Sequence, residues 1–200
     1  MLPGLRTTHD WSAEADQSHV QAVRRDRSRF AAGGGTHLVL EVVEYALDEA
    51  REGATTRVDV VLRPDGSVEV RDDGRGTDTR LDAAGVPVVK PVMATRDLRF
   101  FDVPSAPALG DGVPRSGISV VCALSAWLVH RNRRADGAWE RRYEDGLPAG
   151  APIVVTPDGS TGTSVRFRPD ERLVDPTVDV ARLRRLTRDA TVPVVVSVED

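Results

Sequence analysis

Cysteine is almost absent from this chain of 200 residues, which contains only Cys122. A single cysteine excludes an intrachain disulfide and any metal site built from cysteines. Because Cys122 lies in an apolar run, we expect it to be an ordinary core residue. Long apolar runs are also missing: none approaches the roughly 18 residues of a membrane span. The N-terminus has no basic-then-apolar leader, so we expect a cytoplasmic protein without a membrane segment.

The chain also lacks an excess of positive charge. Lys and Arg number 27 against 31 Asp and Glu, so the formal charge is −4 and the pI is near 5.6. Affinity for nucleic acid depends largely on excess Lys and Arg, and we therefore expect no direct nucleic-acid contact. Apolar residues at 40% and charged residues at 29% are ordinary for a globular protein, and the length suits one domain.

Polar, irregular sequence precedes the first periodic segment. We expect residues 1–15 to form a flexible N-terminal arm and residues 16–200 to form the domain. A short basic helix is expected over residues 16–30. The glycine run at residues 33–35 should then end it and provide a flexible joint.

The strongest periodic segment is a helix that should open at Thr36 and run to about residue 51. At 100° per residue, His37, Glu41, Tyr45 and Asp48 lie on the side opposite an apolar stripe. The stripe consists of Val39, Val43, Ala46 and Ala50. A helix packed on a sheet through this stripe would direct Glu41 and Tyr45 away from the sheet or into a cleft.

A β-hairpin should follow, with its turn at residues 64–66. Strand side chains repeat every two residues, so Val68, Val70 and Asp72 share one face. If the two valines point into a core, Asp72 on the same face points inward as well. A buried carboxylate must find a hydrogen-bond donor or shift its pKa, and Asp72 is therefore a candidate binding residue.

The remaining sequence predicts a long loop, further strands and two more helices. Residues 74–116 are rich in Gly, Pro and Asp and should form a loop with a short helix near residues 86–95. Helices are expected at about residues 116–126 and 178–189, and Thr163 should face inward from a strand between them. This order predicts an α+β fold, namely a two-layer sandwich with a mixed, mainly antiparallel sheet and helices on one face.

Three segments stand in order along the chain: LEVVEYALDEA, VEVRDDGRG and TGTSVRFRPD. They resemble the motifs EVVDNSxDEA, V-x-D-N/D-G-R-G and T-G-T-x-V-x-F-x-P of the ATP-binding domain found in the B subunit of DNA gyrase, a DNA topoisomerase, and in its GHKL (Bergerat-fold) relatives. The similarity spans about residues 20–200 and implies the GHKL fold. It covers the ATP-binding domain alone, so we expect the family's transducer domain, with its catalytic lysine loop, to be absent.

The resemblance implies roles for residues of the three motifs. Glu41 takes the place of the general base that activates water for attack on the γ-phosphate. Asp72 takes the place of the aspartate that binds the adenine amino group, and Thr163 that of the threonine in the adenine-water network. The residues alone leave other interpretations open: a solvated helix glutamate, a capping aspartate and a core-facing threonine.

Further nucleotide-binding candidates follow from the same resemblance. Glu49 and Arg75, with the adjacent Gly76, match the outer pocket wall, where gyrase holds aminocoumarin antibiotics. Val92 and Met93 match the apolar ceiling of the pocket. A surface ion pair and ordinary core packing are the alternatives for these residues.

The sequence departs from the family where metal and phosphate are handled. Tyr45 replaces the Mg²⁺-binding asparagine, and a phenol is a poor ligand for an ion that prefers compact oxygen donors. The G-G-L-H-G-V-G lid, whose N–H groups wrap the phosphates, is replaced by residues 111–117, which include Pro114 and Arg115. Proline removes a donor N–H. Asp78 replaces the family proline after G-R-G-I, and the arginine that reaches antibiotics falls near Glu140.

We therefore predict a gyrase-B-like nucleotide-binding domain that is a pseudo-ATPase, with Glu41 as a relict general base and no metal. Its ligand would be an adenine nucleotide (ATP or ADP), bound weakly and without Mg²⁺, or another flat hydrogen-bonding small molecule. The alternative is a scaffold that contacts gyrase or another partner, or forms a homodimer, through the N-terminal arm with no nucleotide bound. A residual ATPase is a third hypothesis.

Overall fold

The computed structural model describes residue 9 and residues 13–53, 55–77, 79–81, 83 and 87–199. Most of the expected N-terminal arm and Asp78 lie outside these residues. The helices are α1 (Gln17–Arg25), α2 (Arg27–Phe30), α3 (Gly34–Arg51), α4 (Ile118–Ala123) and α5 (Val180–Leu186). The strands are β1 (Val58–Leu62), β2 (Val68–Asp72), β3 (Thr79–Leu81), β4 (Pro87–Val89), β5 (Ser125–Arg134), β6 (Gly137–Glu144), β7 (Leu147–Pro148), β8 (Ile153–Val155), β9 (Gly162–Pro169) and β10 (Val194–Val198).

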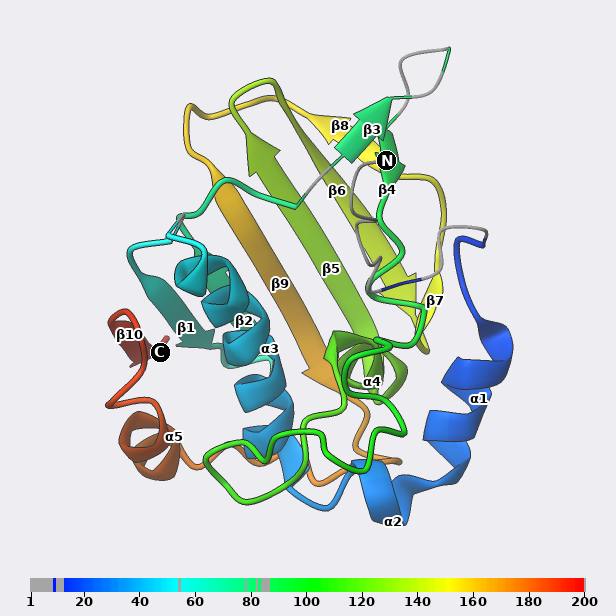
Figure 1. Cartoon of the computed structure of the whole chain (residues 1–200), viewed down its shortest axis with the longest axis vertical. Coiled ribbons are helices and arrows are strands. Elements are labelled where there is room, and N and C mark those ends of the chain that lie inside the picture. Colours follow the sequence, from blue (N-terminus) through cyan, green and yellow to red (C-terminus); the bar gives the residue numbers. More distant parts are fainter. Residues whose placement is uncertain are drawn as a thin grey trace, which may run out of the picture.

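A mixed sheet forms one layer of the molecule, with the strand order β10-β1-β2-β9-β5-β6-β7 and β8 paired to β6. The β1–β10 pair is parallel, and the other described pairs of this sheet are antiparallel. Helices α3 and α4 lie in front of the sheet in Figure 1, where α3 packs on β1, β2 and β9 and α4 on β5. The expected two-layer α+β fold is confirmed.

Helix α3 buries its apolar stripe, as its periodicity predicts, but it begins two residues earlier than expected. Gly34 has a φ of +62°, and a Cβ on Gly35 would lie 2.6 Å from the carbonyl oxygen of Pro176. The glycine run therefore forms a closely packed entry into the helix, and the expected flexible joint is not what the structure shows.

The β1–β2 hairpin forms as predicted. The Asp65 carboxylate accepts a hydrogen bond of 2.9 Å from the Ser67 N–H, and Gly66 adopts a φ of +76°, which closes the turn. Val70 is 2% exposed and Asp72 6% exposed on the covered face of the sheet. Strand alternation therefore placed Asp72 correctly.

Three helix predictions need correction. The helix expected near residues 86–95 is wrong: Pro87–Val89 form β4, which pairs with β3, and turns follow it. Pro91 would interrupt a helix there, because proline lacks an N–H and clashes with the preceding turn. Helix α4 ends at Ala123, three residues before its expected end, because β5 begins at Ser125. Helix α5 covers only residues 180–186.

Cys122 is 1% exposed within the core cluster, which confirms its expected structural role. Burial in apolar surroundings raises the pKa of its thiol. In the parts of the chain that the structure covers, no helix has the length and apolar character needed to span a membrane.

Candidate functional site

Asp72 ends strand β2 and receives hydrogen bonds from two backbone N–H groups. Its Oδ1 accepts from the Gly74 N–H at 2.9 Å, and the Thr163 N–H also donates to the carboxylate. Gly162 permits this approach, since a Cβ there would lie 2.1 Å from the Asp72 carbonyl oxygen. The structure thus brings Asp72 and Thr163 together, as the hairpin and strand patterns predict.

The surroundings of Asp72 raise the pKa of its carboxyl group to about 6. Burial is the main cause, and the charge of Glu49 adds to it. The N–H groups of Gly74 and Thr163 and the charge of Arg133 oppose the increase. A carboxylate offers about four acceptor positions, so two N–H donors leave capacity for a ligand donor. At neutral pH, Asp72 is therefore a buried anion that can accept further hydrogen bonds.

Tyr45 lies on α3 with its hydroxyl 3.0 Å from the Thr77 Oγ1. Burial is the largest cause that raises the pKa of this phenol, so it stays neutral at physiological pH. The backbone of Thr77 is bound in turn by Asn132 of β5: the Thr77 N–H donates to Oδ1 at 2.7 Å, and Nδ2 donates to the Thr77 carbonyl at 3.0 Å. Tyr45 is therefore fixed between α3 and the turn that follows β2.

The predicted outer wall forms an ion pair, with 3.0 Å between Arg75 Nε and Glu49 Oε2. Arg75 also contacts Glu52 at 2.6 Å, and its side chain is 53% exposed, so these pairs contribute little stability. Val92 lines a cavity, whereas Met93 is fully buried in the core cluster. Of the two predicted ceiling residues, only Val92 reaches this cavity.

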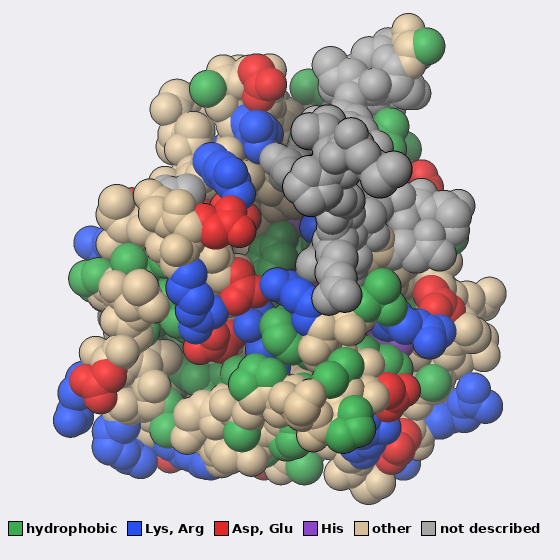
Figure 2. Space-filling model, viewed as in Figure 1, with side chains coloured by type: hydrophobic (Ala, Val, Ile, Leu, Met, Phe, Trp, Pro, Cys, Tyr) green, Lys and Arg blue, Asp and Glu red, His purple; other side chains and the backbone are tan. Residues whose placement is uncertain are grey.

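The cavity has a volume of about 180 Å³. Its described lining residues are His9, Tyr45, Asp48, Glu49, Glu52, Thr77, Lys90, Val92 and Arg99. Figure 2 shows acidic and basic side chains gathered around a hollow in the centre of this face. Asp72 and Thr163 are not among the described lining residues, so the cavity reaches only the outer part of the predicted pocket. Its volume equals that of roughly six water molecules.

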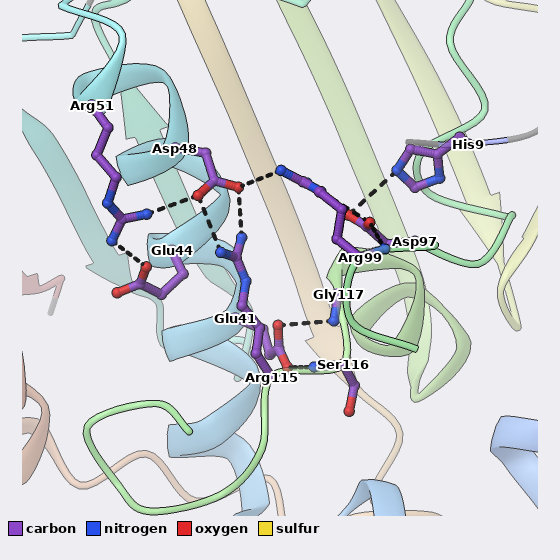
Figure 3. A network of polar contacts seen from close by, with 10 residues as sticks. All are labelled: His9, Glu41, Glu44, Asp48, Arg51, Asp97, Arg99, Arg115, Ser116 and Gly117. Carbon is purple, nitrogen blue, oxygen red and sulfur yellow. Dashed lines mark hydrogen bonds and ion pairs between the residues drawn. The ribbon is translucent and has the colours of Figure 1, made fainter. Parts of the chain in front are cut away.

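Glu41 is 1% exposed and contacts both His37 of α3 and the segment before α4. Its carboxylate accepts hydrogen bonds from the Ser116 N–H at 2.5 Å and the Gly117 N–H at 3.1 Å (Figure 3). His37 lies 3.5 Å from Glu41 through Nε2 and 2.9 Å from Asp111 through Nδ1. Burial disfavours the imidazolium, but Glu41 and Asp111 outweigh burial and raise the pKa of His37. The interpretation of Glu41 as a solvated helix residue is wrong.

Arg115 enters the site from residues 111–117, the segment that is predicted to replace the family lid and is called the lid segment below. Its Nη1 and Nη2 lie 3.1 and 2.8 Å from the two carboxylate oxygens of Asp48, and its guanidinium lies 4.0 Å from the centre of the Phe100 ring. Arg51 and Arg99 approach the same carboxylate at 2.8 and 3.4 Å, as Figure 3 shows. The Asp48 carboxylate thus pairs with three arginines: Arg51 of α3, Arg99 of the 97–101 segment and Arg115 of the lid segment.

Sequence reasoning missed several of these contacts. The helical period placed His37 on the same face as Glu41, one turn before it, but the contact between them was not predicted. Asp48 belongs to the DEA part of the helix motif, but nothing marked Arg115 as its partner. Asn132 gave no signal, because it binds the backbone of Thr77, which is 55 residues away in the sequence.

Sequence comparisons relate this chain to the B subunits of DNA gyrase and DNA topoisomerase 4. The B subunit of DNA gyrase from Mycobacterium tuberculosis is 37% identical over 162 residues, which cover 79% of this chain and 24% of that protein. The B subunit of DNA topoisomerase 4 from Streptococcus pneumoniae is 35% identical over 168 residues, covering 79% of this chain and 26% of that protein. This chain is a gyrase-B-like domain. It spans about a quarter of the length of these relatives, and no protein-family profile matches it.

In this gyrase-B-like domain, Glu41, Tyr45 and Glu49 follow one another at four-residue intervals along α3. Residues four apart are neighbours on a helix surface, so these three side chains form one row. Glu41 contacts the lid segment at one end of the row, and Glu49 acts electrostatically on Asp72 at the other. Tyr45 therefore lies between the predicted phosphate end and the predicted adenine end of the site.

Proposed function

We propose that this gyrase-B-like nucleotide-binding domain is a GHKL-type pseudo-ATPase, which binds an adenine-type ligand through Asp72 without hydrolysing ATP. One observation carries the proposal. The N–H groups of Ser116 and Gly117, in the segment that would wrap the phosphates, donate instead to the carboxylate of Glu41. Glu41 is also only 1% exposed, so in this arrangement its carboxylate is shielded from water, and the two N–H groups point at Glu41 instead of at a phosphate.

The residues present do not fit the Mg²⁺ ion that the resemblance implies. Tyr45 stands where the family has its metal-binding asparagine, and its neutral phenol is hydrogen-bonded to Thr77. Magnesium prefers compact, hard oxygen ligands in octahedral geometry, which a buried phenol does not supply. Both oxygens of Glu41 already accept N–H donors.

In this proposal, Arg115 is also unavailable to bind phosphate. The Arg115 guanidinium is paired with both oxygens of Asp48, and Arg99 approaches the same carboxylate. Phosphoryl transfer is catalysed mainly by positioning and by positive groups around the transferred phosphate. A triphosphate would have to displace these pairs and approach the carboxylates of Asp48 and Glu41.

The ligand chemistry follows from Asp72. An exocyclic amine, amide or phenol on a flat ring would supply the donor that this buried carboxylate can still accept. The phosphate end adds little affinity, so adenosine, ADP and ATP should bind with similar, weak affinities. We expect dissociation constants from roughly tens of micromolar to millimolar. Titration calorimetry with the three ligands, with and without EDTA, measures this directly.

ATP turnover by the purified protein is expected to stay at background. A positioned general base supplies typically about 10²–10⁴-fold, and Glu41 can do so only if water and the γ-phosphate lie beside it. Tyr45→Asn alone should not restore turnover, because Pro114 and Arg115 remain in the lid segment. Steady phosphate release by the wild type that disappears in Glu41→Gln would contradict the proposal. Absence of binding by all three ligands would favour the scaffold hypothesis.

A further inference from the structure

Asn132 is a fully buried amide on the covered face of strand β5. Its register partner on β9 is Thr163, which places the two side chains next to each other on the same face of the sheet. Both ends of the Asn132 amide bind the Thr77 backbone, at 2.7 Å for the N–H and 3.0 Å for the carbonyl. An amide that both accepts from and donates to one residue fixes the position and orientation of that residue.

The end of β5 also contacts the rest of the turn that follows Asp72. Arg134 Nη1 lies 3.3 Å from the Gly76 carbonyl oxygen, and Arg133 Nη2 lies 3.5 Å from the Asp72 carbonyl oxygen. Gly76 has a φ of +81°, and a Cβ there would lie 2.6 Å from both the Asn132 Oδ1 and the Arg133 carbonyl oxygen. This close fit requires glycine and holds the turn against the end of the strand.

The same contacts continue across the site to α3. The Thr77 hydroxyl lies 3.0 Å from the Tyr45 hydroxyl, so Asn132, Thr77 and Tyr45 form one hydrogen-bonded strut from β5 to α3. Gly74, whose N–H binds the Asp72 carboxylate, lies in the turn that the strut supports. The position of the turn therefore sets how Asp72 is hydrogen-bonded and how far water can reach it.

We infer that Asn132 is a positioning residue for ligand recognition: it holds the turn of residues 73–77 in the geometry in which Asp72 is presented to a ligand donor. Its effect on ligand affinity rests on the proposed function, whereas its effect on Asp72 does not. Without the clamp, the turn would sample positions in which water solvates the carboxylate and the Gly74 N–H points elsewhere. A ligand would then bind only the fraction of molecules with the turn in place.

The test compares Asn132→Leu with a matched control, His130→Leu. His130 lies two residues earlier on the same face of β5, it is fully buried, and neither ring nitrogen has a hydrogen-bond partner among the described residues. Titration of Asp72 is followed by carboxyl-carbon NMR in the unliganded proteins. Adenosine affinity is measured by calorimetry.

Asn132→Leu should lower the midpoint of the Asp72 titration by about one pH unit, because burial is the largest cause of the raised pKa and its loss outweighs the loss of the Gly74 hydrogen bond. It should also weaken adenosine binding roughly tenfold, as expected if about one molecule in ten keeps the turn in place. His130→Leu should leave both quantities unchanged. A folded Asn132→Leu protein with the wild-type Asp72 midpoint, or with tighter adenosine binding, would overturn the inference.

A second measurement does not depend on the variant folding. In the wild type, the Thr77 amide should exchange with solvent as slowly as the amides of β5, because its N–H is bonded to a buried side chain. Rapid exchange at Thr77 would overturn the inference. If the wild type binds no adenosine, the proposed function fails, but the Asp72 titration and the Thr77 exchange rate still decide the role of Asn132.

Discussion

Asp72→Asn is expected to weaken adenosine binding by roughly 10- to 150-fold, because a hydrogen bond to a charged acceptor contributes about 1.5–3 kcal/mol. The asparagine has nearly the same shape, so the change removes the charge with little effect on packing. Calorimetric titration of both proteins at pH 7.5 measures the difference. Equal affinities would mean that ligands bind elsewhere, for example in the cavity lined by Glu49 and Val92.

Binding should also depend on pH through the same residue. The pKa of Asp72 is raised to about 6, and only the ionised form accepts fully from a ligand donor. Affinity should therefore rise about tenfold between pH 5 and pH 7, following the ionised fraction. Asp72→Asn should bind weakly at both pH values, and a parallel pH dependence in this variant would assign the effect to another group.

The contribution of Asp72 to the free energy of unfolding of the unliganded protein should fall as the pH rises, whereas ligand affinity should increase. The pKa of Asp72 in the folded protein, about 6, lies above its ordinary value of 3.8. Its contribution to stability is thus fully present below pH 3.8 and is lost as the pH rises through about 6. A difference of about two pH units corresponds to about 3 kcal/mol. At pH 8, Asp72→Asn should be more stable than the wild type by up to about 3 kcal/mol, measured by urea unfolding.

Glu41→Ala is expected to destabilise the fold by about 3–5 kcal/mol, the range found when one partner of a buried charged pair is removed. The change leaves His37 with Asp111 as its one acidic partner among these contacts and removes the acceptor of two buried N–H groups. For a domain of this size the melting temperature should fall by about 6–20 °C, measured by calorimetry.

Glu41→Gln is the matched control for this prediction. Its side-chain oxygen can still accept one of the two N–H groups, so its melting temperature should fall less than that of Glu41→Ala. A carboxylate kept only for catalysis often costs stability, and its removal then leaves the protein unchanged or more stable. An unchanged or higher melting temperature in Glu41→Ala would therefore contradict a structural role for Glu41.

The fold and the inner half of the site could be predicted because they depend on short-range patterns. Strand alternation placed Asp72 on the covered face, and the helical period placed the apolar stripe of α3 on the sheet. Motif order related Thr163 to Asp72, although 91 positions separate them. Such patterns repeat within a few residues, so one sequence is enough to recognise them.

The phosphate end of the site could not be predicted in the same way. Pro114 and Arg115 led to the prediction of an altered lid, but the sequence did not show that Arg115 binds Asp48 or that Glu41 accepts the Ser116 N–H. These contacts join residues more than 60 positions apart through backbone groups or single side chains, which leave no periodic signal. The strand β4 was missed because a three-residue strand in a loop rich in Gly and Pro resembles any other turn region.

The pairing of Arg115 with Asp48 also determines which solution conditions control the lid segment. Asp48, which holds the lid segment through Arg115, is part of the same chain. Its effective concentration near Arg115 is therefore fixed and does not depend on the concentration of nucleotide. The Asp48 side chain is 26% exposed, so dissolved ions reach this contact. Screening at about 0.15 M salt has a range of about 8 Å and shortens as salt increases. The lid segment is therefore expected to become less ordered as the ionic strength rises. A lid that is closed by ATP would instead respond to the concentration of ATP.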